Sequence, residues 1–261
     1  MKLKIYQVDA FSDKVFAGNP AAVVPLQEWL PEEQMQKIAA ENNLAETAFF
    51  VKNDKGYYIR WFTPTDEVPL CGHATLASAY VLFELLGYKE EKVVFDCKSG
   101  LLEVSKKDGW ITMNFPVNKV ESVVLNYNFK KAFGTSPIET YQSAGGYLLL
   151  VFSSGEEVKN IQPCFNDIAE WGTKAVVVTA KGKEFDFVSR MFAPKIGVNE
   201  DPVTGSAHTR LIPFWSERLG KTEMLAKQVS QRGGILKCKM LGNRVEMSGQ
   251  AVLYLTGEIY I

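Results

Sequence analysis

The segment F-T-P-T-D-E-V-P-L-C-G-H-A-T-L-A-S-A-Y-V-L-F-E-L-L-G, residues 62–87, decides the fold of this chain. It opens with a polar, turn-rich loop, reaches a corner at Cys71-Gly72-His73 and continues as a run that is apolar on nearly every helical face. A helix without a polar face lies inside a protein rather than on its surface, and glycine commonly follows the end of a helix. Because Gly87 ends the run, the segment predicts a buried central helix over residues 72–86.

A second copy of this segment lies at residues 192–220, F-A-P-K-I-G-V-N-E-D-P-V-T-G-S-A-H-T-R-L-I-P-F-W-S-E-R-L-G. Gly72 aligns with Gly205 and Gly87 with Gly220, both at a shift of 133 positions, and the second loop is three residues longer. Two copies are too few for a repeat array, which needs at least about three. The pattern therefore predicts a duplicated domain with a second central helix over residues 205–219. We expect Pro213 to kink or delay that helix, because proline removes a helical hydrogen bond.

The length of 261 residues suits two domains of about 130 residues each. Predicted strands alternate with the two central helices, which is typical of an α+β protein. Residues 116–137 form the most polar and least periodic stretch of the chain. We therefore expect an N-terminal half at 1–117 and a C-terminal half at 118–261, each a mixed β-sheet wrapped around its central helix. The final strand is a candidate for packing on the first half.

The composition is that of an ordinary globular protein, with 46% hydrophobic and 23% charged residues and a net charge of −1. No cluster of basic residues interleaved with aromatics marks a nucleic-acid surface, and no apolar run reaches the roughly 18 residues of a membrane span. Asp9 interrupts the apolar region that a signal peptide would need. The four cysteines lack C-x-x-C spacing, so we expect reduced thiols, a cytoplasmic location and no metal site. The expected partner is a small molecule.

The starts of the two predicted helices are the features best suited to binding a ligand. A helix start presents unpaired N–H groups and partial positive charge to an anion, and glycine at Gly72 and Gly205 lets a ligand approach the backbone. If a pseudo-twofold axis relates the halves, both starts face one cleft, which should hold a carboxylate. The alternative is that both glycines serve only tight turns and that Ser206 is an N-cap.

Four motifs in order along the chain carry a family resemblance: A-G-N-P-A-A-V-V (17–24), N-L-A-E-T-A-F-F (43–50), P-L-C-G-H-A-T-L-A (69–77) and E-D-P-V-T-G-S-A-H (200–208). Together they resemble the phenazine biosynthesis PhzF-like family, whose fold is similar to that of diaminopimelate epimerase. The resemblance implies a cofactor-independent isomerase that has two pseudo-symmetric domains, an active site between them and a homodimeric assembly.

The resemblance also implies roles for single residues. It makes Glu46 the acid and base that moves a proton, and His73 and Asp201 the groups that polarise the substrate. Substrate-binding positions fall on Asn19, Gly72, Gly205 and Ser206. One carboxylate can take and return a proton if it is shielded from water, and burial among apolar neighbours would raise the pKa of Glu46 toward the working range.

Each of these residues also has a plainer interpretation. Glu46 suits a solvent-facing strand position, His73 a hydrogen-bonded corner and Asp201 a helix cap, while His208 matches no motif role and is interpreted as structural. The related epimerases use two opposed cysteines, but Thr204 stands opposite Cys71 in the repeat, and a hydroxyl is a poor base. Two rival functions stay open. One is an epimerase or racemase pairing Cys71 or Glu46 with Asp201, and the other is a non-catalytic protein that binds a small carboxylate.

Overall fold

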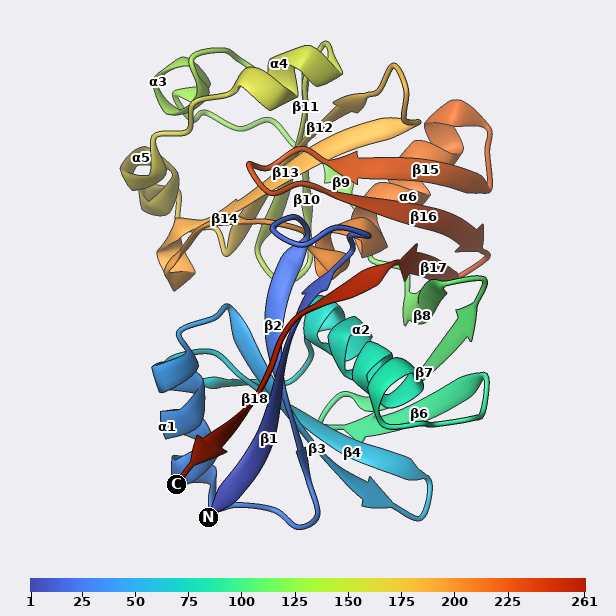
Figure 1. Cartoon of the computed structure of the whole chain (residues 1–261). Helices are drawn as coiled ribbons and strands as arrows, with labels where there is room; N and C mark the ends of the chain where they lie inside the picture. Colours follow the sequence, from blue (N-terminus) through green and yellow to red (C-terminus); the bar gives the residue numbers. More distant parts are fainter. The chain divides into compact units, whose positions relative to one another are not determined.

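The structure is a computed structural model that describes residues 1–261 (Figure 1). The chain divides into two compact units, called here the first unit (residues 1–115 and 246–261) and the second unit (residues 116–245). Both mix strands and helices, with strands predominating, so the expected α+β class is confirmed. None of the helices combines the length and the apolar character that crossing a membrane requires.

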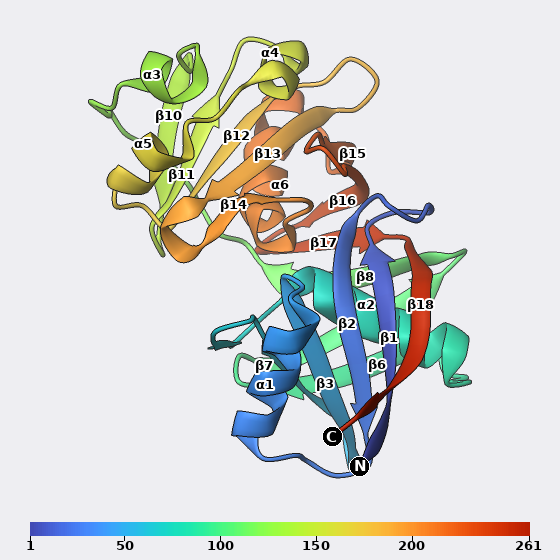
Figure 2. The same ribbon diagram turned by 60° about the vertical axis from the view of Figure 1, so that its left-hand side comes forward.

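The first unit is a mixed sheet around one central helix. Neighbouring strands run in the order β18-β1-β2-β3-β4-β6-β7-β8-β17, with parallel pairs at β2–β3 and β4–β6 and antiparallel pairs at most other positions. Figure 2 shows α2 between β1–β2 on one side and β6–β8 on the other. The elements are β1 (Lys2–Ala10), β2 (Asn19–Leu26), α1 (Glu32–Asn42), β3 (Glu46–Asn53), β4 (Gly56–Phe62), β5 (Glu67–Val68), α2 (Gly72–Tyr80), η1 (Val81–Leu85), β6 (Lys92–Cys97), β7 (Gly100–Lys107), β8 (Trp110–Pro116), β17 (Arg244–Gly249) and β18 (Ala251–Tyr260).

The central helix is buried because its sequence offers no polar face. All residues of α2 from His73 to Ala79 are buried, and the helix contacts β1, β2, β3 and β18. Strand β17 approaches the helix so closely that a Cβ at Gly249 would lie 2.9 Å from the Leu76 side chain of α2. The α-helix ends earlier than predicted: residues 81–85 form a π-helical turn, in which the Leu86 N–H donates to the Val81 carbonyl five residues back.

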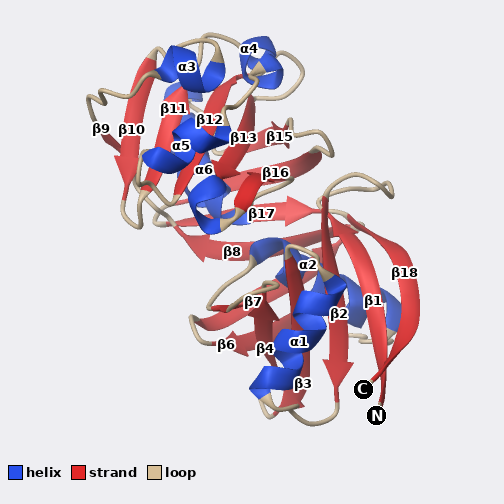
Figure 3. Cartoon of the chain, turned by 90° about the vertical axis from the view of Figure 1, so that its left-hand side faces the viewer, coloured by secondary structure: helices blue, strands red, loops and turns tan.

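The second unit repeats the pairing pattern of the first. Strands β10, β11, β12 and β13 pair antiparallel, parallel and antiparallel, as β1 to β4 do, and β13 pairs with β15 in parallel as β4 does with β6 (Figure 3). The elements are β9 (Glu121–Ser122), α3 (Phe129–Phe133), β10 (Glu139–Ser143), β11 (Tyr147–Val151), α4 (Gly155–Asn160), α5 (Phe165–Glu170), β12 (Ala175–Lys181), β13 (Phe187–Ala193), η2 (Pro194–Ile196), β14 (Val198–Asp201), α6 (Gly205–Leu219), β15 (Glu223–Gln228) and β16 (Gly234–Leu241).

Helix α6 begins at Gly205 and runs unbroken through Pro213, so the expectation of a late start is wrong. Proline at 213 has no N–H to donate to the carbonyl of Thr209, four residues earlier. That carbonyl instead accepts from the Asn118 N–H at 3.1 Å, and the Asn118 side chain donates to Thr209 Oγ1 at 2.9 Å. An external donor therefore replaces the missing helical one.

Each unit holds the loop before its central helix with an arginine–glutamate pair. Arg60 on β4 donates twice to Glu67, at 2.8 and 2.7 Å, and Arg190 on β13 donates twice to Glu200, at 2.7 and 2.9 Å. Bidentate pairs of this kind fix geometry as well as charge. Glu67 and Glu200, which occupy equivalent places in the sequence repeat, therefore anchor the loop rather than take part in chemistry.

Candidate active site

Four residues that the sequence singled out, Asn19, Glu46, Cys71 and His73, meet at the start of α2. Strands β2 and β3 are parallel, with Ala21 beside Glu46, so Asn19 and Glu46 lie at the same end of these two neighbouring strands. Helix α2 begins near this end and brings His73 between them. The contacts are His73 Nε2 to Glu46 Oε2 at 3.2 Å, Asn19 Nδ2 to His73 Nδ1 at 3.2 Å and Cys71 Sγ to His73 Nδ1 at 3.5 Å. We call these four residues the His73 cluster.

The His73 cluster is shielded from solvent. Asn19, Cys71 and His73 are buried, and the Glu46 side chain is 19% exposed. Burial lowers the pKa of His73 to about 3, because the interior cannot solvate an imidazolium as water does. The ring is therefore neutral near pH 7, and Glu46 faces a polar but uncharged partner.

The start of α2 lacks a side-chain cap and has no acidic residue in its first turn. Its N-cap residue is Cys71, whose carbonyl accepts from Thr75 Oγ1 at 2.5 Å. Gly72 is the first helical residue, as the motif predicted. A helix start of this kind keeps its partial positive charge available to an anion.

In the second unit, Asp201 and Thr204 lie together before the start of α6. Thr204 Oγ1 donates to Asp201 Oδ2 at 2.5 Å. The buried side chain of Gln228 joins them: its Oε1 accepts from the Thr204 N–H at 3.0 Å and its Nε2 donates to the Asp201 carbonyl at 2.6 Å. Sequence reasoning missed Gln228, because a glutamine ending a strand carries no signal without the contact. Asp201 therefore accepts a hydrogen bond from the N-cap residue of α6.

The first residues of α6 differ chemically from those of α2. Ser206 is exposed, with its hydroxyl 3.5 Å from the hydroxyl of Tyr147. Arg210, one turn later, is buried, donates to the Ser206 carbonyl at 2.9 Å and stacks over the Tyr147 ring at 3.8 Å. Burial lowers the pKa of Arg210 from its usual value. Neither Tyr147 nor Arg210 was predicted, because both act through contacts distant in sequence.

His208 bonds the backbone at the start of α6. Its Nδ1 lies 2.8 Å from the carbonyl of Thr204, the N-cap residue of α6. In the first unit, Thr75 makes the equivalent contact, because its hydroxyl bonds the carbonyl of Cys71, the N-cap residue of α2. Burial lowers the pKa of His208 to about 4, while the bond to the Thr204 carbonyl opposes the shift.

The His73 cluster contains three groups of the kinds that bind metal ions, close enough together to hold one. Donor atoms of Glu46, Cys71 and His73 lie within 4.8 Å of one another. Glu46 contacts Nε2 of the ring and Cys71 contacts Nδ1. Because these two contacts use different nitrogens of the ring, the cluster also provides the contacts that a proton-transfer site needs.

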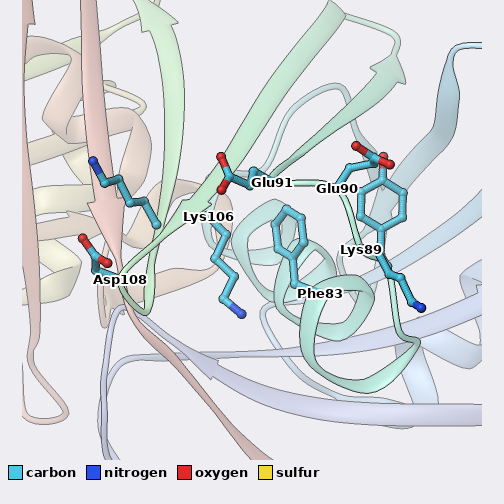
Figure 4. Close-up of a pocket in the computed structure, with 8 residues that line it drawn as sticks. Phe83, Lys89, Glu90, Glu91, Lys106 and Asp108 are labelled. Atoms are coloured by element: carbon cyan, nitrogen blue, oxygen red, sulfur yellow. The ribbon is translucent and has the colours of Figure 1, made fainter.

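A cavity of about 360 Å³ in the first unit lies away from this cluster. It surrounds Phe83 on η1 with charged side chains, among them Glu91 and Lys106 (Figure 4). Phe83 is ten residues beyond His73, which corresponds to about 15 Å along a helix. Its acidic residues, Glu90, Glu91 and Asp108, are exposed, and none of the residues of the four motifs lines it, so it is not the candidate active site.

Comparison with known proteins agrees with the four motifs. Residues 8–257 match the model of a family described as phenazine biosynthesis-like protein. The chain is 47% identical to an uncharacterized isomerase of Pseudomonas aeruginosa, with 99% of each chain covered. A crystal structure of a PhzF-family phenazine biosynthesis protein from Enterococcus faecalis matches with a TM-score of 0.97 and 47% identity, covering all of both chains.

A more distant structure shows how widely this fold is shared. A hydroxyproline epimerase from Agrobacterium vitis matches with a TM-score of 0.61 at 9% identity, over 99% of this chain and 92% of that one. At this identity the likeness concerns the fold alone. The full-length matches at 47% identity decide the family: the chain belongs to the phenazine biosynthesis-like protein family, and it is an isomerase.

Proposed function

We propose that this isomerase moves a proton, with or without a double bond, within a small carboxylate-bearing substrate, and that Glu46 is both acid and base. The observation that carries the proposal is the 3.2 Å approach of Glu46 Oε2 to Nε2 of a buried, neutral His73. A general base must be ionised yet able to keep the proton that it takes. A neutral ring N–H stabilises the carboxylate without supplying the full opposite charge that would weaken it as a base.

The substrate carboxylate is assigned to the starts of the central helices, with Gly72, Gly205 and Ser206 as binding residues. Two observations support this assignment: neither α2 nor α6 has a side-chain cap, and neither has an acidic residue in its first turn. Asp201 is proposed to polarise the substrate. We expect Ser206→Ala to raise KM and Asp201→Asn to lower kcat.

We also infer that the two units are copies of one ancestral domain with a diaminopimelate epimerase-like architecture. Three features support the inference: the shared order of strand pairing, the Arg60–Glu67 and Arg190–Glu200 pairs, and the bonds from Thr75 and His208 to the carbonyl of the N-cap residue. These features lie inside each unit and do not depend on the position of one unit against the other.

The experiment is solvent exchange at carbon. The protein is incubated in D₂O with cyclic and amino-acid carboxylates, and deuterium at carbon is followed by mass spectrometry. We expect Glu46→Gln to reduce exchange at least about 100-fold, the lower range for a general acid–base group, while ligand binding persists. The matched control is Glu41→Gln, which alters an exposed glutamate of the same unit.

One rival has a specific observation in its favour, because Cys71 Sγ also touches the His73 ring. If exchange survives Glu46→Gln but is lost in Cys71→Ser, the thiol is the base and an epimerase reaction replaces our proposal. Binding without exchange in the parent protein would point to a non-catalytic carboxylate-binding protein.

A further inference from the structure

The two histidines of the chain contact opposite kinds of hydrogen-bonding group through the same ring atom. His73 Nδ1 lies 3.2 Å from the amide nitrogen of Asn19, whereas His208 Nδ1 lies 2.8 Å from a backbone carbonyl. We propose that Asn19 is a positioning residue that holds His73 in the tautomer with its proton on Nε2, directed at Glu46. The catalytic consequence rests on the proposed function, but the tautomer itself does not.

The neighbours of His73 Nδ1 make it an acceptor. An asparagine NH₂ group can only donate, and a cysteine thiol donates weakly. Asn19 Nδ2 and Cys71 Sγ lie 3.2 and 3.5 Å from this nitrogen. Because a neutral imidazole carries one proton, a lone pair on Nδ1 places the proton on Nε2.

The contact with Glu46 on the other side of the ring also favours the tautomer of His73 with its proton on Nε2. Its Oε2 lies 3.2 Å from His73 Nε2, and an ionised carboxylate offers only lone pairs. If the proton were on Nδ1, the unprotonated Nε2 would lie 3.2 Å from a carboxylate oxygen with no proton between them, which is electrostatically unfavourable in a buried site. The Asn19 amide orientation and the carboxylate therefore require the same tautomer.

The backbone around Asn19 explains why its side chain can act as a fixed donor. Asn19 is fully buried and opens β2, where it pairs with Ala10 of β1. Gly18 before it has a φ of +69°, and a Cβ there would lie 2.2 Å from the Ala10 carbonyl oxygen. The loop that leads to this turn is held by Asp9, whose Oδ2 accepts from the Phe16 N–H at 2.9 Å.

His208 supplies an internal control with the opposite tautomer. The carbonyl of Thr204 can only accept, so Nδ1 of His208 carries the proton and Nε2 does not. Both rings are buried and neutral near pH 7. Because the chain has two histidines, each can be assigned by removing the other.

The test is nuclear magnetic resonance of protein labelled with ¹⁵N-histidine, without substrate, at pH 7. We expect His73 to show a protonated Nε2 and His208 a protonated Nδ1, with His73→Gln and His208→Gln identifying the signals. A proton on Nδ1 of His73, or a doubly protonated ring, would overturn the assignment. The parent protein must show one ring of each tautomer, so a spectrum with two rings of the same tautomer refutes the assignment without any variant.

Two substitutions then test Asn19 itself. Asn19→Asp replaces the donor with an acceptor of equal size, so the proton of His73 should move to Nδ1 or a second proton should bind, while His208 stays unchanged. Asn19→Ser keeps a hydroxyl donor and should retain the parent tautomer. If Asn19→Asp leaves the His73 signal as in the parent, Asn19 does not set the tautomer and the proposal is wrong.

Kinetics separate positioning from substrate binding. We expect Asn19→Asp to lower kcat in the exchange assay about 100-fold, the scale of a general acid–base contribution, with little change in KM. A rise in KM at unchanged kcat would instead make Asn19 a substrate ligand and refute the positioning role. A parent protein with the stated tautomer but no exchange contradicts only the proposed isomerase reaction.

Discussion

Replacing Arg190 by methionine should destabilise the protein more than the equivalent replacement of Arg60, although both arginines pair with a glutamate in the same way. All three guanidinium nitrogens of Arg190 donate hydrogen bonds within the second unit. Nε and Nη2 donate to the Glu200 carboxylate, and Nη1 donates to carbonyls at the end of α4, including that of Ile161 at 2.6 Å. The Arg190 and Glu200 side chains are 9% and 19% exposed. Arg190→Met leaves a sheltered carboxylate and several carbonyls without donors.

Replacing Arg60 leaves fewer buried groups without a hydrogen-bond partner than replacing Arg190 does. Glu67 keeps a second cation, because Lys98 also contacts it. Hydrogen bonds from Arg60 first and from Lys98 next lower the pKa of Glu67 against the effect of burial. The other partner of Arg60 is Glu32, whose side chain is 69% exposed and already solvated. Arg60→Met therefore removes an interaction without stranding a buried charge.

The structure sets the expected magnitudes. Removing one partner of a buried pair costs about 3–5 kcal/mol, which we expect for Arg190→Met. Losing hydrogen bonds to a charged group costs about 1.5–3 kcal/mol, and we expect Arg60→Met near the lower limit. At roughly 2–4 °C per kcal/mol for a protein of this size, thermal unfolding resolves the two variants.

A further variant separates the stranded charge from the lost packing. Arg190→Met combined with Glu200→Gln should regain part of the stability, because it removes the unpaired carboxylate but leaves the α4 carbonyls without their donor. Equal losses in the two single variants, or a greater loss for Arg60→Met, would refute the reasoning. A double variant no more stable than Arg190→Met would show that the carboxylate is not the source of the loss.

Three further predictions follow from the buried histidines, the His73 cluster and helix α6. The pKa values of His73 and His208 are lowered to about 3 and about 4 in the folded protein, so below pH 6.5 the unfolded chain binds more protons than the folded one. The free energy of unfolding, measured by urea titration, should therefore fall by a few kcal/mol as the pH drops from about 6.5 to 4. The fall should be smaller in His208→Gln. Because Glu46 and Cys71 contact different nitrogens of His73, exhaustive chelation should leave solvent exchange unchanged; loss of exchange that zinc restores would contradict this geometry. Pro213→Ala should change the free energy of unfolding by less than about 1 kcal/mol, because the Thr209 carbonyl already accepts from Asn118. Proline in a helix interior usually costs ~3 kcal/mol relative to alanine. If denaturant titration showed Pro213→Ala to be more stable by nearly that amount, the Asn118 bond would not compensate for the proline.

The sequence predicted elements well where one pattern acts locally, and less well where tertiary contacts decide. The apolar run after Gly72 and the N-cap position before it are local signals, so the start of α2 could be predicted, but the π-helical turn at residues 81–85 could not. Short helix α3 lies in the stretch judged least periodic, because five residues are too few to show a period. Pro213 misled for the opposite reason: its local rule holds, but a residue 95 positions earlier supplies the missing bond.

The same distinction explains which part of the candidate site was visible. Motif matches placed Glu46, His73 and Asn19 in a site, but not the order of contacts, in which His73 Nε2 lies 3.2 Å from Glu46 Oε2 and Nδ1 lies 3.2 Å from Asn19 Nδ2. That order depends on the parallel register of β2 and β3, which sequence alone does not fix. Gln228 stayed hidden because it meets Thr204 only through the tertiary fold.

Equivalent positions in the two units keep the contact that holds the start of the central helix but differ at the position of His73. Thr75 and His208 are 133 positions apart, and each bonds the carbonyl of the residue that begins its central helix. A histidine in the second unit therefore does the structural work that a threonine does in the first. At the position equivalent to His73 the second unit has Ser206, whose hydroxyl is exposed rather than set against a carboxylate. The scaffold contact is kept with different side chains, whereas the contact between Glu46 and His73 has no counterpart in the motif of the second unit. That asymmetry favours a mechanism in which a single carboxylate takes and returns the proton over one that opposes two equivalent bases.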